Sequence, residues 1–514
     1  MAPDLQDKKG MHWSEIIAEE VIREKSPPYA VLSGMTTSGP LHPGTLCEFM
    51  FADAIYKSMK RAAEGEEVRF YFFADILDAF DSIPEPFKPY EAQLAPHLGK
   101  PLVHTPDPME CHHSFADHFL AEATDAMVKF GAHPTIIRAE KAYAEGKYDK
   151  YSVMFSERKE EIKEIVRISS LRESMPEGWH PIMPICEKCG KVSTTRVASY
   201  SEGEYRYSCD QDVKYTKGCG HSGRARISDH KYKLLFRLDW PSRQDFLRIS
   251  AEGGSVDHHT KGGTLSTVAA VHREFFKKEP PVFYKFGFLK YKGKKYSKSK
   301  GIGHTVEELM QVLPIPLLQY ALLRPDIQED KELVLEESTL LPLIADFEAV
   351  GGLDANSQMA RPERKKLISY ALTEGKKWNA PIVDILVTYS IYKDWKKTGE
   401  ITGDPAGVAY LAPYIAQWLS RGWIPDKYVF ELGKGKKAEN PALVRKFAGR
   451  LRDGMGEEDV QALVFSTAKE NGASPAALFK DLYTVLIGKP MGPRFGKFAA
   501  VAGIGRIKSI LSAA

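Results

Sequence analysis

Short apolar runs and helical periodicity alternate through the N-terminal part of the chain. Residues 29–32 form an apolar run that enters a loop rich in Gly, Thr, Ser and Pro at 34–44. From Gly44 to Met59 apolar residues recur every three or four positions, which predicts a helix. A second β-favouring run follows at residues 68–73. Strand, loop, helix and strand in this order predict a βαβ unit, and therefore an α/β fold with a doubly wound parallel sheet.

Later segments continue this alternation around one interruption. A charged and periodic stretch at residues 150–175 predicts a helix. Residues 181–225 are rich in Cys, Gly and polar turns, which is typical of an insertion. Strand-like runs return at 234–240 and at 282–289. The pattern therefore predicts one α/β domain that carries an inserted segment.

Strand signals fade beyond about residue 355, whereas helix signals persist. Thr305 and Glu308 form a capping box that predicts a helix start. Ser474 followed by Pro475 predicts another start, and Gly488 predicts the end of that helix. The last third of the chain is therefore predicted to be all-helical.

Composition narrows the class of protein. The 514 residues are 43% hydrophobic and 27% charged, which excludes a collagen-like, disulfide-dense or wholly disordered chain. The first thirty residues show no secretory signal, and no run approaches the roughly 18 apolar residues of a membrane span. Four of the six cysteines are clustered, which does not form a disulfide framework. We therefore expect a cytoplasmic protein.

Basic residues are concentrated in two segments although the net charge is only +3. Residues 434–514 hold fourteen bases and seven acids, and residues 285–300 hold seven lysines and no acid. Solvated basic faces would explain both segments. They also suit a nucleic-acid partner, because phosphate contacts are built from Lys and Arg.

The loop at residues 34–46, GMTTSGPLHPGTL, has the properties of a phosphate site. Small residues let backbone amides approach a phosphate, and the following helix directs its positive N-terminus towards the same point. His42 lies just before that helix and can bond phosphate oxygens as charge develops on them. The alternative is a βα loop with an incidental His.

A second basic loop, KGKKYSKSKG, occupies residues 292–301. Its glycines, serines and closely spaced lysines suit a mobile loop that closes on a triphosphate. A solvated basic turn is the alternative.

Four cysteines suggest a metal site in the predicted insertion. Cys186, Cys189, Cys209 and Cys219 follow the spacing C-x2-C-x19-C-x9-C, and the first pair resembles half of a zinc knuckle. His221 could replace Cys219 as a ligand. A redox pair or unrelated thiols are the alternatives. Four protein ligands leave no open position, so we predict a structural zinc without a catalytic role.

Two short motifs together resemble the signatures of class I aminoacyl-tRNA synthetases. HPGT at 42–45 resembles their HIGH motif, and KYSKS at 295–299 resembles KMSKS. Four further segments resemble the class I lysyl-tRNA synthetases in the expected order: HLGKPLVHTPDP, LDWPSR, VDHHTKGG and GKPMGPRFG. The chain departs from the usual pattern at Thr45, Cys47 and Tyr296. Cys47 stands where the family commonly has a basic residue.

This resemblance implies a lysine–tRNA ligase. Such an enzyme activates lysine with ATP and Mg²⁺ to lysyl-adenylate, and then transfers lysyl to the 3′ end of tRNA(Lys). We expect no obligate protein partner, and a monomer. The implied domains are a Rossmann-like catalytic domain at 1–305 with the zinc-binding insertion at about 176–230, a connecting helical segment at 306–355 and an anticodon-binding helical domain at 356–514.

The resemblance also implies site residues. The expected catalytic residues are His42, Thr45, Lys295 and Lys298. The expected ATP-binding residues are His42, Gly44, Ser297, Lys298 and Ser299. The expected lysine-binding residues are Gly34, Thr36, Glu48, Trp240, His258 and Tyr284. Glu48 is the favoured acceptor for the substrate's ε-ammonium, and Asp75 and Asp239 are alternatives.

The helical last third is expected to read the anticodon. Its bases are interleaved with Phe447, Phe495 and Phe498. We expect these rings to stack on unpaired anticodon bases.

Three other functions remain as alternatives. A nucleotidyltransferase independent of tRNA would share both loops but would not need the helical third. An RNA-binding paralogue without activity would keep the basic region and lose the site. A glutamate-specific relative would surround its substrate side chain with a cation.

Overall fold

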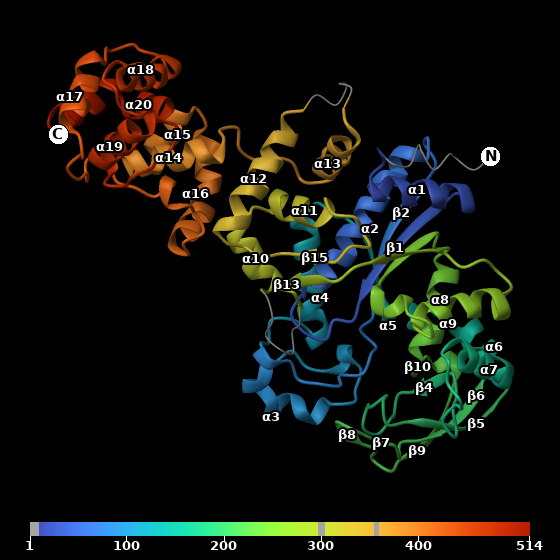
Figure 1. The fold of residues 1–514 in the computed structure, drawn as a ribbon. Coiled ribbons are helices and arrows are strands. Elements are labelled where there is room, and N and C mark those ends of the chain that lie inside the picture. The colour runs from blue at the N-terminus through green and yellow to red at the C-terminus, as the bar shows by residue number, and fades with distance from the viewer. Residues whose placement is uncertain (1–9, 297–303, 354–358) are drawn as a thin grey trace. The chain divides into compact units, whose positions relative to one another are not determined.

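A five-stranded, wholly parallel sheet organises the first part of the chain in the computed structural model, which describes residues 10–296, 304–353 and 359–514. Figure 1 shows the elements in chain order. The strand order is β12-β11-β1-β2-β3. The strands are β1 (Tyr29–Met35), β2 (Val68–Ala74), β3 (Thr135–Arg138), β11 (Ala251–Ser255) and β12 (Val282–Phe286). The predicted doubly wound α/β fold is confirmed.

Helices cover this sheet and account for its buried strands. The middle of β1, Ala30 to Leu32, is fully buried, as expected for a parallel sheet that is covered on both faces. The helices of the first part are α1 (Trp13–Glu24), α2 (Pro43–Ala62), α3 (Glu91–Leu94), α4 (Phe115–Lys129), α5 (Ala139–Ala144), α6 (Asp149–Glu157), α7 (Lys159–Ser169), α8 (Phe236–Phe246) and α9 (Thr264–Ala270). Residues predicted as one helix at 150–175 thus form two, α6 and α7.

The segment between α7 and α8 is a small β structure. Its strands are β4 (Ile182–Pro184), β5 (Arg196–Ser201), β6 (Glu204–Ser208), β7 (Asp212–Val213), β8 (Thr216–Lys217), β9 (Ser222–Arg226) and β10 (Tyr232–Leu234). The antiparallel pair β4 and β10 forms its base. The predicted insertion is therefore a distinct structural element.

One predicted strand is wrong. The run at 234–240 is strand only as far as Leu234, and α8 begins at Phe236. Leu238, Trp240 and Ser242 are buried on this helix. A short apolar run does not distinguish a strand from a buried helix, because both place apolar residues at closely spaced positions.

The sheet is followed by short strands and then by helices. These elements are β13 (Leu289–Tyr291), β14 (Lys294–Lys295), α10 (Val306–Val312), α11 (Ile315–Leu323), β15 (Lys331–Glu332), α12 (Glu337–Gly351) and α13 (Arg361–Ala371). Thr305 and Glu308 form the predicted capping box, with each backbone N–H bonded to the other residue's side chain at 2.8 and 3.1 Å.

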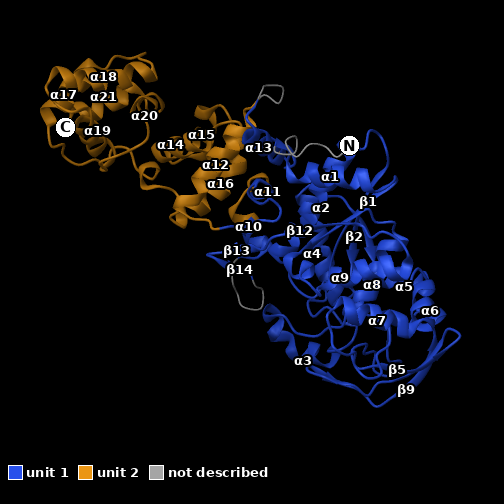
Figure 2. Ribbon diagram, turned by 45° about the vertical axis from the view of Figure 1, so that its right-hand side comes forward, with its two compact units in different colours: residues 1–309, 318–333, 356–374 blue, residues 310–317, 334–355, 375–514 orange. Residues whose placement is uncertain are grey.

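The chain forms two compact units, which Figure 2 distinguishes by colour. The first comprises residues 1–309, 318–333 and 356–374, and the second comprises 310–317, 334–355 and 375–514. From residue 375 onwards the described elements are helices: α14 (Ile382–Tyr392), α15 (Trp395–Thr402), α16 (Pro405–Ser420), α17 (Pro441–Arg450), α18 (Glu457–Glu470), α19 (Pro475–Ile487), α20 (Phe495–Ala502) and α21 (Ile504–Ser512). Ser474 caps α19 as predicted, and Gly488 ends it in a left-handed conformation. None of the helices that the structure describes is long and apolar enough to cross a membrane.

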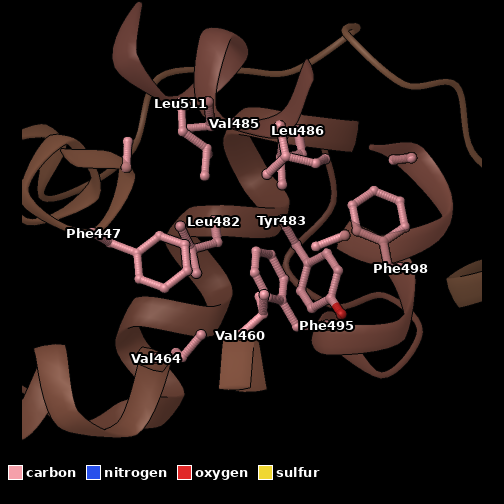
Figure 3. Close-up of a cluster of buried hydrophobic side chains, with 14 of the residues drawn as sticks. Phe447, Val460, Val464, Leu482, Tyr483, Val485, Leu486, Phe495, Phe498 and Leu511 are labelled. Carbon is pink, nitrogen blue, oxygen red and sulfur yellow. The ribbon is translucent and has the colours of Figure 1, made fainter. Parts of the chain in front are cut away.

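The rings expected to stack on anticodon bases lie instead in the core of the second unit. Phe447, Phe495 and Phe498 are at most 1% exposed and pack among Leu482 and other apolar side chains (Figure 3). That expectation is therefore wrong. Their spacing among basic residues reflects amphipathic helices, whose apolar face is buried and whose basic face is not.

Candidate functional site

The carboxyl ends of the parallel strands converge on a cavity of about 170 Å³ in the first unit. The ends of β1, β2, β11 and β12 meet at the same edge, where ligands bind in open α/β sheets. All six residues expected to bind the amino-acid substrate line this cavity: Gly34, Thr36, Glu48, Trp240, His258 and Tyr284. The structure therefore brings together residues that are as far as 250 positions apart in the sequence.

Aromatic rings form the walls of this cavity. Trp240 and Tyr284 are each only 5% exposed. The His258 ring stands perpendicular to Trp240, with centroids 5.3 Å apart. The Tyr284 ring packs directly against Gly253. Any side chain at position 253 would displace the ring, because a Cβ on that residue would lie 2.1 Å from a ring carbon of Tyr284. This slot suits an alkyl chain, which stays in contact with apolar surface while a charged end reaches a polar partner.

Glu48 supplies a carboxyl group to the cavity from the second turn of α2. The surrounding protein desolvates it and raises the pKa of Glu48 to about 7, and the charge of nearby Glu252 adds to this rise. Glu48 has no ion pair among the residues that the structure describes. A cationic ligand would meet an uncompensated carboxylate here, which favours its binding.

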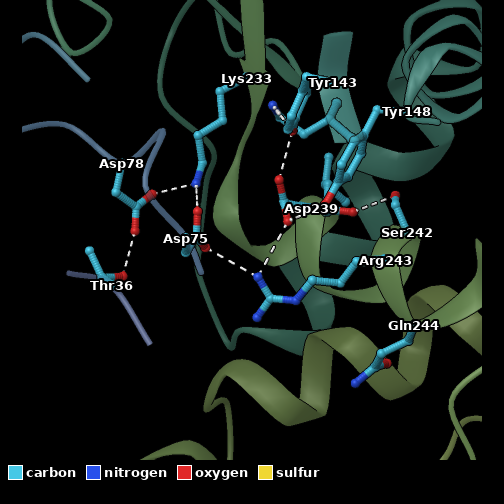
Figure 4. Close-up of polar contacts among 12 residues, drawn as sticks. Thr36, Asp75, Asp78, Tyr143, Tyr148, Lys233, Asp239, Ser242, Arg243 and Gln244 are labelled. Carbon is cyan, nitrogen blue, oxygen red and sulfur yellow. Dashed lines mark hydrogen bonds and ion pairs between the residues drawn. The ribbon is translucent and has the colours of Figure 1, made fainter. Parts of the chain in front are cut away.

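The two alternative carboxylates are already committed to other partners (Figure 4). Asp239 is fully buried and accepts hydrogen bonds from Tyr143 at 2.6 Å and Tyr148 at 3.0 Å. It is absent from the cavity lining. Asp75 lines the cavity but pairs with Lys233 at 2.5 Å and with Arg243 at 3.1 Å. Geometry therefore favours Glu48 over Asp75 and Asp239.

Lys233 links the base of the insertion to this edge of the sheet. It extends from β10, is 3% exposed, and also donates to Asp78, whose other oxygen accepts from Thr36 at 2.8 Å. Burial opposes the charge of Lys233, but Asp75 and Asp78 raise the pKa of the ammonium well above its ordinary value. Burial also opposes the charge of Asp75, yet Lys233 and Arg243 keep the pKa of that carboxyl below its ordinary value.

A second cavity, of about 220 Å³, contains the residues expected to handle phosphate. His42, Gly44, Thr45 and Lys295 line it, and Glu48 lines both cavities. The N-terminus of the 20-residue helix α2 opens here, and its dipole favours anions. Lys295 pairs with Asp257 at 2.8 Å and is about half exposed. Ser297, Lys298 and Ser299 lie outside the described residues.

Cys47 does not contribute charge to this cavity. It is 3% exposed, and burial raises the pKa of its thiol to about 12. The thiol is therefore neutral at physiological pH. Positive charge near the second cavity comes from the helix dipole and from lysines rather than from position 47.

The four predicted zinc ligands converge in the insertion. The sulfur atoms of Cys186, Cys189, Cys209 and Cys219 all lie within 4.8 Å of one another. His221 instead pairs with Glu187 at 2.8 Å. The four-cysteine alternative is therefore favoured over the one that includes His221, and the thiol donor set suits zinc.

A second group of possible metal ligands was not singled out from the sequence. Ligand atoms of Asp107, Cys111, His112 and His118 lie within 4.8 Å of one another, just before α4 and within its first turn. The Asp107 side chain is 1% exposed, and its Oδ2 accepts the backbone N–H of His112 at 3.0 Å. The spacing D-x3-C-H-x5-H was the available signal. This set combines a carboxylate, a thiol and two imidazoles, which are zinc ligands.

Comparison with known proteins agrees with this geometry. The family model described as tRNA synthetases class I (K) matches residues 11–374. A lysine–tRNA ligase of Archaeoglobus fulgidus is 30% identical over 98% of this chain and 100% of its own length. One from Thermoplasma volcanium is 30% identical over 98% and 99%, and lysine–tRNA ligase 1 of Methanosarcina acetivorans is 28% identical over 95% of each chain. With the HIGH-like loop, the aromatic slot and Glu48 at one sheet edge, these matches show that the chain belongs to the class I tRNA synthetase family of the lysine (K) type.

Proposed function

We propose that this chain is a lysine–tRNA ligase, which activates lysine with ATP and transfers it to tRNA(Lys). One observation carries the assignment of lysine. The same cavity is lined by aromatic rings and by the carboxyl of Glu48, which no described cation neutralises. A lysine side chain matches both features, because its stem is apolar and its end is an ammonium. Glutamate would need a cation at the position of Glu48.

The reaction requires positioning and charge stabilisation rather than a covalent enzyme intermediate. A carboxylate oxygen of lysine attacks the α-phosphorus of ATP, and the bond from that phosphorus to the bridging oxygen breaks to release pyrophosphate. The tRNA 3′ hydroxyl then attacks the lysyl carbonyl, and AMP leaves. Glu48 lines both cavities, so substrates in the two cavities would lie next to each other.

Six of the expected residues are assigned roles in the first step. His42 and Thr45 contact phosphate oxygens, and Lys295 and Lys298 stabilise the departing pyrophosphate. Gly34 and Thr36 hold the α-amino and carboxylate ends of lysine. Mg²⁺ accompanies ATP and neutralises part of the triphosphate charge.

Aminoacylation of total tRNA with each of the twenty amino acids tests this function. We expect charging with lysine alone, and only when ATP is present. Charging with glutamate at equal or higher kcat/KM would overturn the assignment of lysine. A chain that binds tRNA without consuming ATP would be the RNA-binding paralogue.

We also propose that the helical segment 356–514 binds the anticodon arm. Its buried phenylalanines are excluded from stacking, whereas Phe465 on α18 is 49% exposed and lies beside Phe479, with ring centroids 5.6 Å apart. An exposed aromatic ring is suited to stack on an unpaired base.

Phe465→Ala is therefore expected to raise the KM for tRNA(Lys) about tenfold, which is the effect of losing one stacked base. The KM for lysine should stay unchanged. Met491→Ala is a matched control, because Met491 is also exposed in this segment and is not aromatic. Equal KM values for tRNA in wild type and Phe465→Ala would contradict the role of Phe465.

We further propose that the four-cysteine cluster holds a structural zinc that organises the insertion. Metal analysis of the purified chain should find about one zinc when this cluster alone is filled, and two when the Asp107 group also binds zinc. Cys186→Ser should lower the count by one and impair tRNA charging before ATP binding. A count well below one in the wild type would contradict both sites.

A further inference from the structure

Glu252 is a buried carboxyl at the substrate cavity that the roles described above leave unexplained. It extends from β11, is 3% exposed, and lines the same cavity as Glu48 and Tyr284. Burial raises the pKa of Glu252 above its ordinary value, although Arg243 acts in the opposite direction. A carboxyl kept in such a position needs either a permanent partner or a cationic ligand.

Two side chains hold Glu252 in one orientation. Gln244 on α8 donates from Nε2 to one carboxyl oxygen of Glu252. The Oε1 of the same Gln244 lies 2.9 Å from Nε2 of His272. Burial lowers the pKa of His272 to about 4, so the ring is neutral, and it donates from Nε2 to the amide. This chain of hydrogen bonds orients Glu252 and adds no charge to it.

The cations near Glu252 are shared among other carboxylates. Arg243 pairs with Asp75 at 3.1 Å and with Asp239 at 3.5 Å, and Lys233 pairs with Asp75 and Asp78. Three carboxyl groups, those of Glu48, Asp75 and Glu252, thus line this cavity, and Arg243 is the one cation among the described residues that line it. The site has an excess of negative charge that a ligand with an ammonium group would neutralise.

The groups that face Glu252 come from three elements. Arg243 and Gln244 lie on α8, Glu48 lies on α2, and Tyr284 lies on β12. Glu48 is close enough for Glu252 to raise its pKa. Both carboxyls line one small cavity whose walls are aromatic, so a single ammonium at the end of the slot would meet both.

We infer that Glu252 is a second specificity-determining residue, which shares the ε-ammonium of lysine with Glu48. This inference rests on the proposed function and extends it. Two carboxylates around one ammonium discriminate more strongly against neutral side chains of the same length than one does, because a neutral ligand leaves both carboxylates unpaired. Gln244 and His272 act as positioning residues for Glu252.

The variant Glu252→Gln tests the inference, because it keeps the shape of the side chain and removes its charge. We expect the KM for lysine to rise about 10- to 100-fold, as for the loss of a hydrogen bond to a charged group, with the KM for ATP unchanged. Selectivity for lysine over 6-hydroxynorleucine, measured as a ratio of kcat/KM in aminoacylation, should fall by a similar factor. An unchanged KM and selectivity would overturn the inference.

The pH dependence separates this role from a structural one. In the wild type the KM for lysine should rise as pH falls below about 7, because Glu48 then takes up a proton. Glu252→Gln removes the repulsion that raises the pKa of Glu48, so this rise should begin at lower pH. An onset at the same pH in both proteins would contradict the shared site.

Asp245→Asn is the matched control. Asp245 is the neighbour of Gln244 on α8, but it pairs with Tyr151 and Lys278 and does not line the cavity. Its KM for lysine should equal that of the wild type.

If Glu252→Gln does not fold, Glu252→Asp provides a second test, because it keeps the charge on a shorter side chain. Its KM for lysine should rise less than tenfold, and its selectivity for lysine should be retained. Loss of selectivity in Glu252→Asp would count against the inference. Failure of the wild type to charge lysine would instead refute the proposed function.

Discussion

Replacing His42 with Ala is expected to lower the kcat of lysyl-adenylate formation by about 10²- to 10³-fold, the usual cost of losing one transition-state donor. His42 Nδ1 accepts the backbone N–H of Gly44 at 2.9 Å, so the proton of the neutral ring lies on Nε2. Nε2 can therefore donate to a phosphate oxygen. Because the phosphate charge develops during the reaction, kcat should fall much more than the KM for ATP rises.

His42 has a second role that this experiment must separate. It is the N-cap of α2, and losing a cap costs about 1 kcal/mol of stability. His42→Asn is the control, because Asn is a good N-cap residue with a shorter side chain that does not reproduce the Nε2 donor. We expect His42→Asn to recover the stability and not the kcat. Pyrophosphate exchange with tRNA present measures the rate, and thermal unfolding measures the stability. Recovery of kcat in His42→Asn would show that the residue acts only through the helix cap.

Local sequence patterns were sufficient to predict which residues line the second cavity, and their contacts with phosphate stay a prediction. His42 is the N-cap of α2, Gly44 and Thr45 lie in its first turn and Glu48 in its second, so their proximity depends on one helix start. The loop with Lys295 was predicted from its lysines in the same way. The parallel sheet followed from the alternation of strand and helix signals, because successive βαβ units place strand ends at one edge.

Residues that act through distant partners could not be predicted in this way. Glu252 lies in the strand AEGGS, whose glycines hide the apolar pattern of a buried strand. Its partners Gln244 and His272 come from other elements, and only the packing of α8 against the sheet brings them together. The prediction that Phe447, Phe495 and Phe498 stack on anticodon bases was wrong for a related reason. The spacing of residues along a helix does not show which of its faces is covered by other elements.

Lys233 is the clearest case of a residue that the sequence could not identify. The residues next to it in the sequence do not distinguish it from a lysine exposed to solvent. Its partners Asp75 and Asp78 lie about 155 positions earlier, and the chain must complete β4, the whole insertion and β10 before Lys233 reaches them. The Lys233 side chain is 4% exposed in this arrangement, so its charge is compensated by carboxylates rather than by water.

Replacing Lys233 with Met is expected to lower the free energy of unfolding of the first unit by about 3–5 kcal/mol, as found when one partner of a buried ion pair is removed. Met fills nearly the same volume, so the loss comes from the carboxylates: buried Asp75 keeps only Arg243 as a partner, and the partly exposed Asp78 loses its cation. Denaturation by urea, followed by tryptophan fluorescence, measures the change. Lys129→Met, which breaks an exposed pair with Asp125, should have far less effect.

The dependence on pH identifies the cause of this loss. In the wild type Lys233 and Arg243 keep the pKa of Asp75 low, so the stabilisation that Asp75 provides is present at neutral pH and is lost as pH falls through that low pKa. In Lys233→Met the buried carboxyl groups bind protons more readily in the folded state than in the unfolded state. The variant should therefore gain stability relative to the wild type as pH falls from 7 towards 5, and a second change, Asp78→Asn, should restore part of the loss at pH 7. A deficit that is the same at both pH values, and that Asp78→Asn does not reduce, would show that Lys233 stabilises the fold by packing rather than by charge.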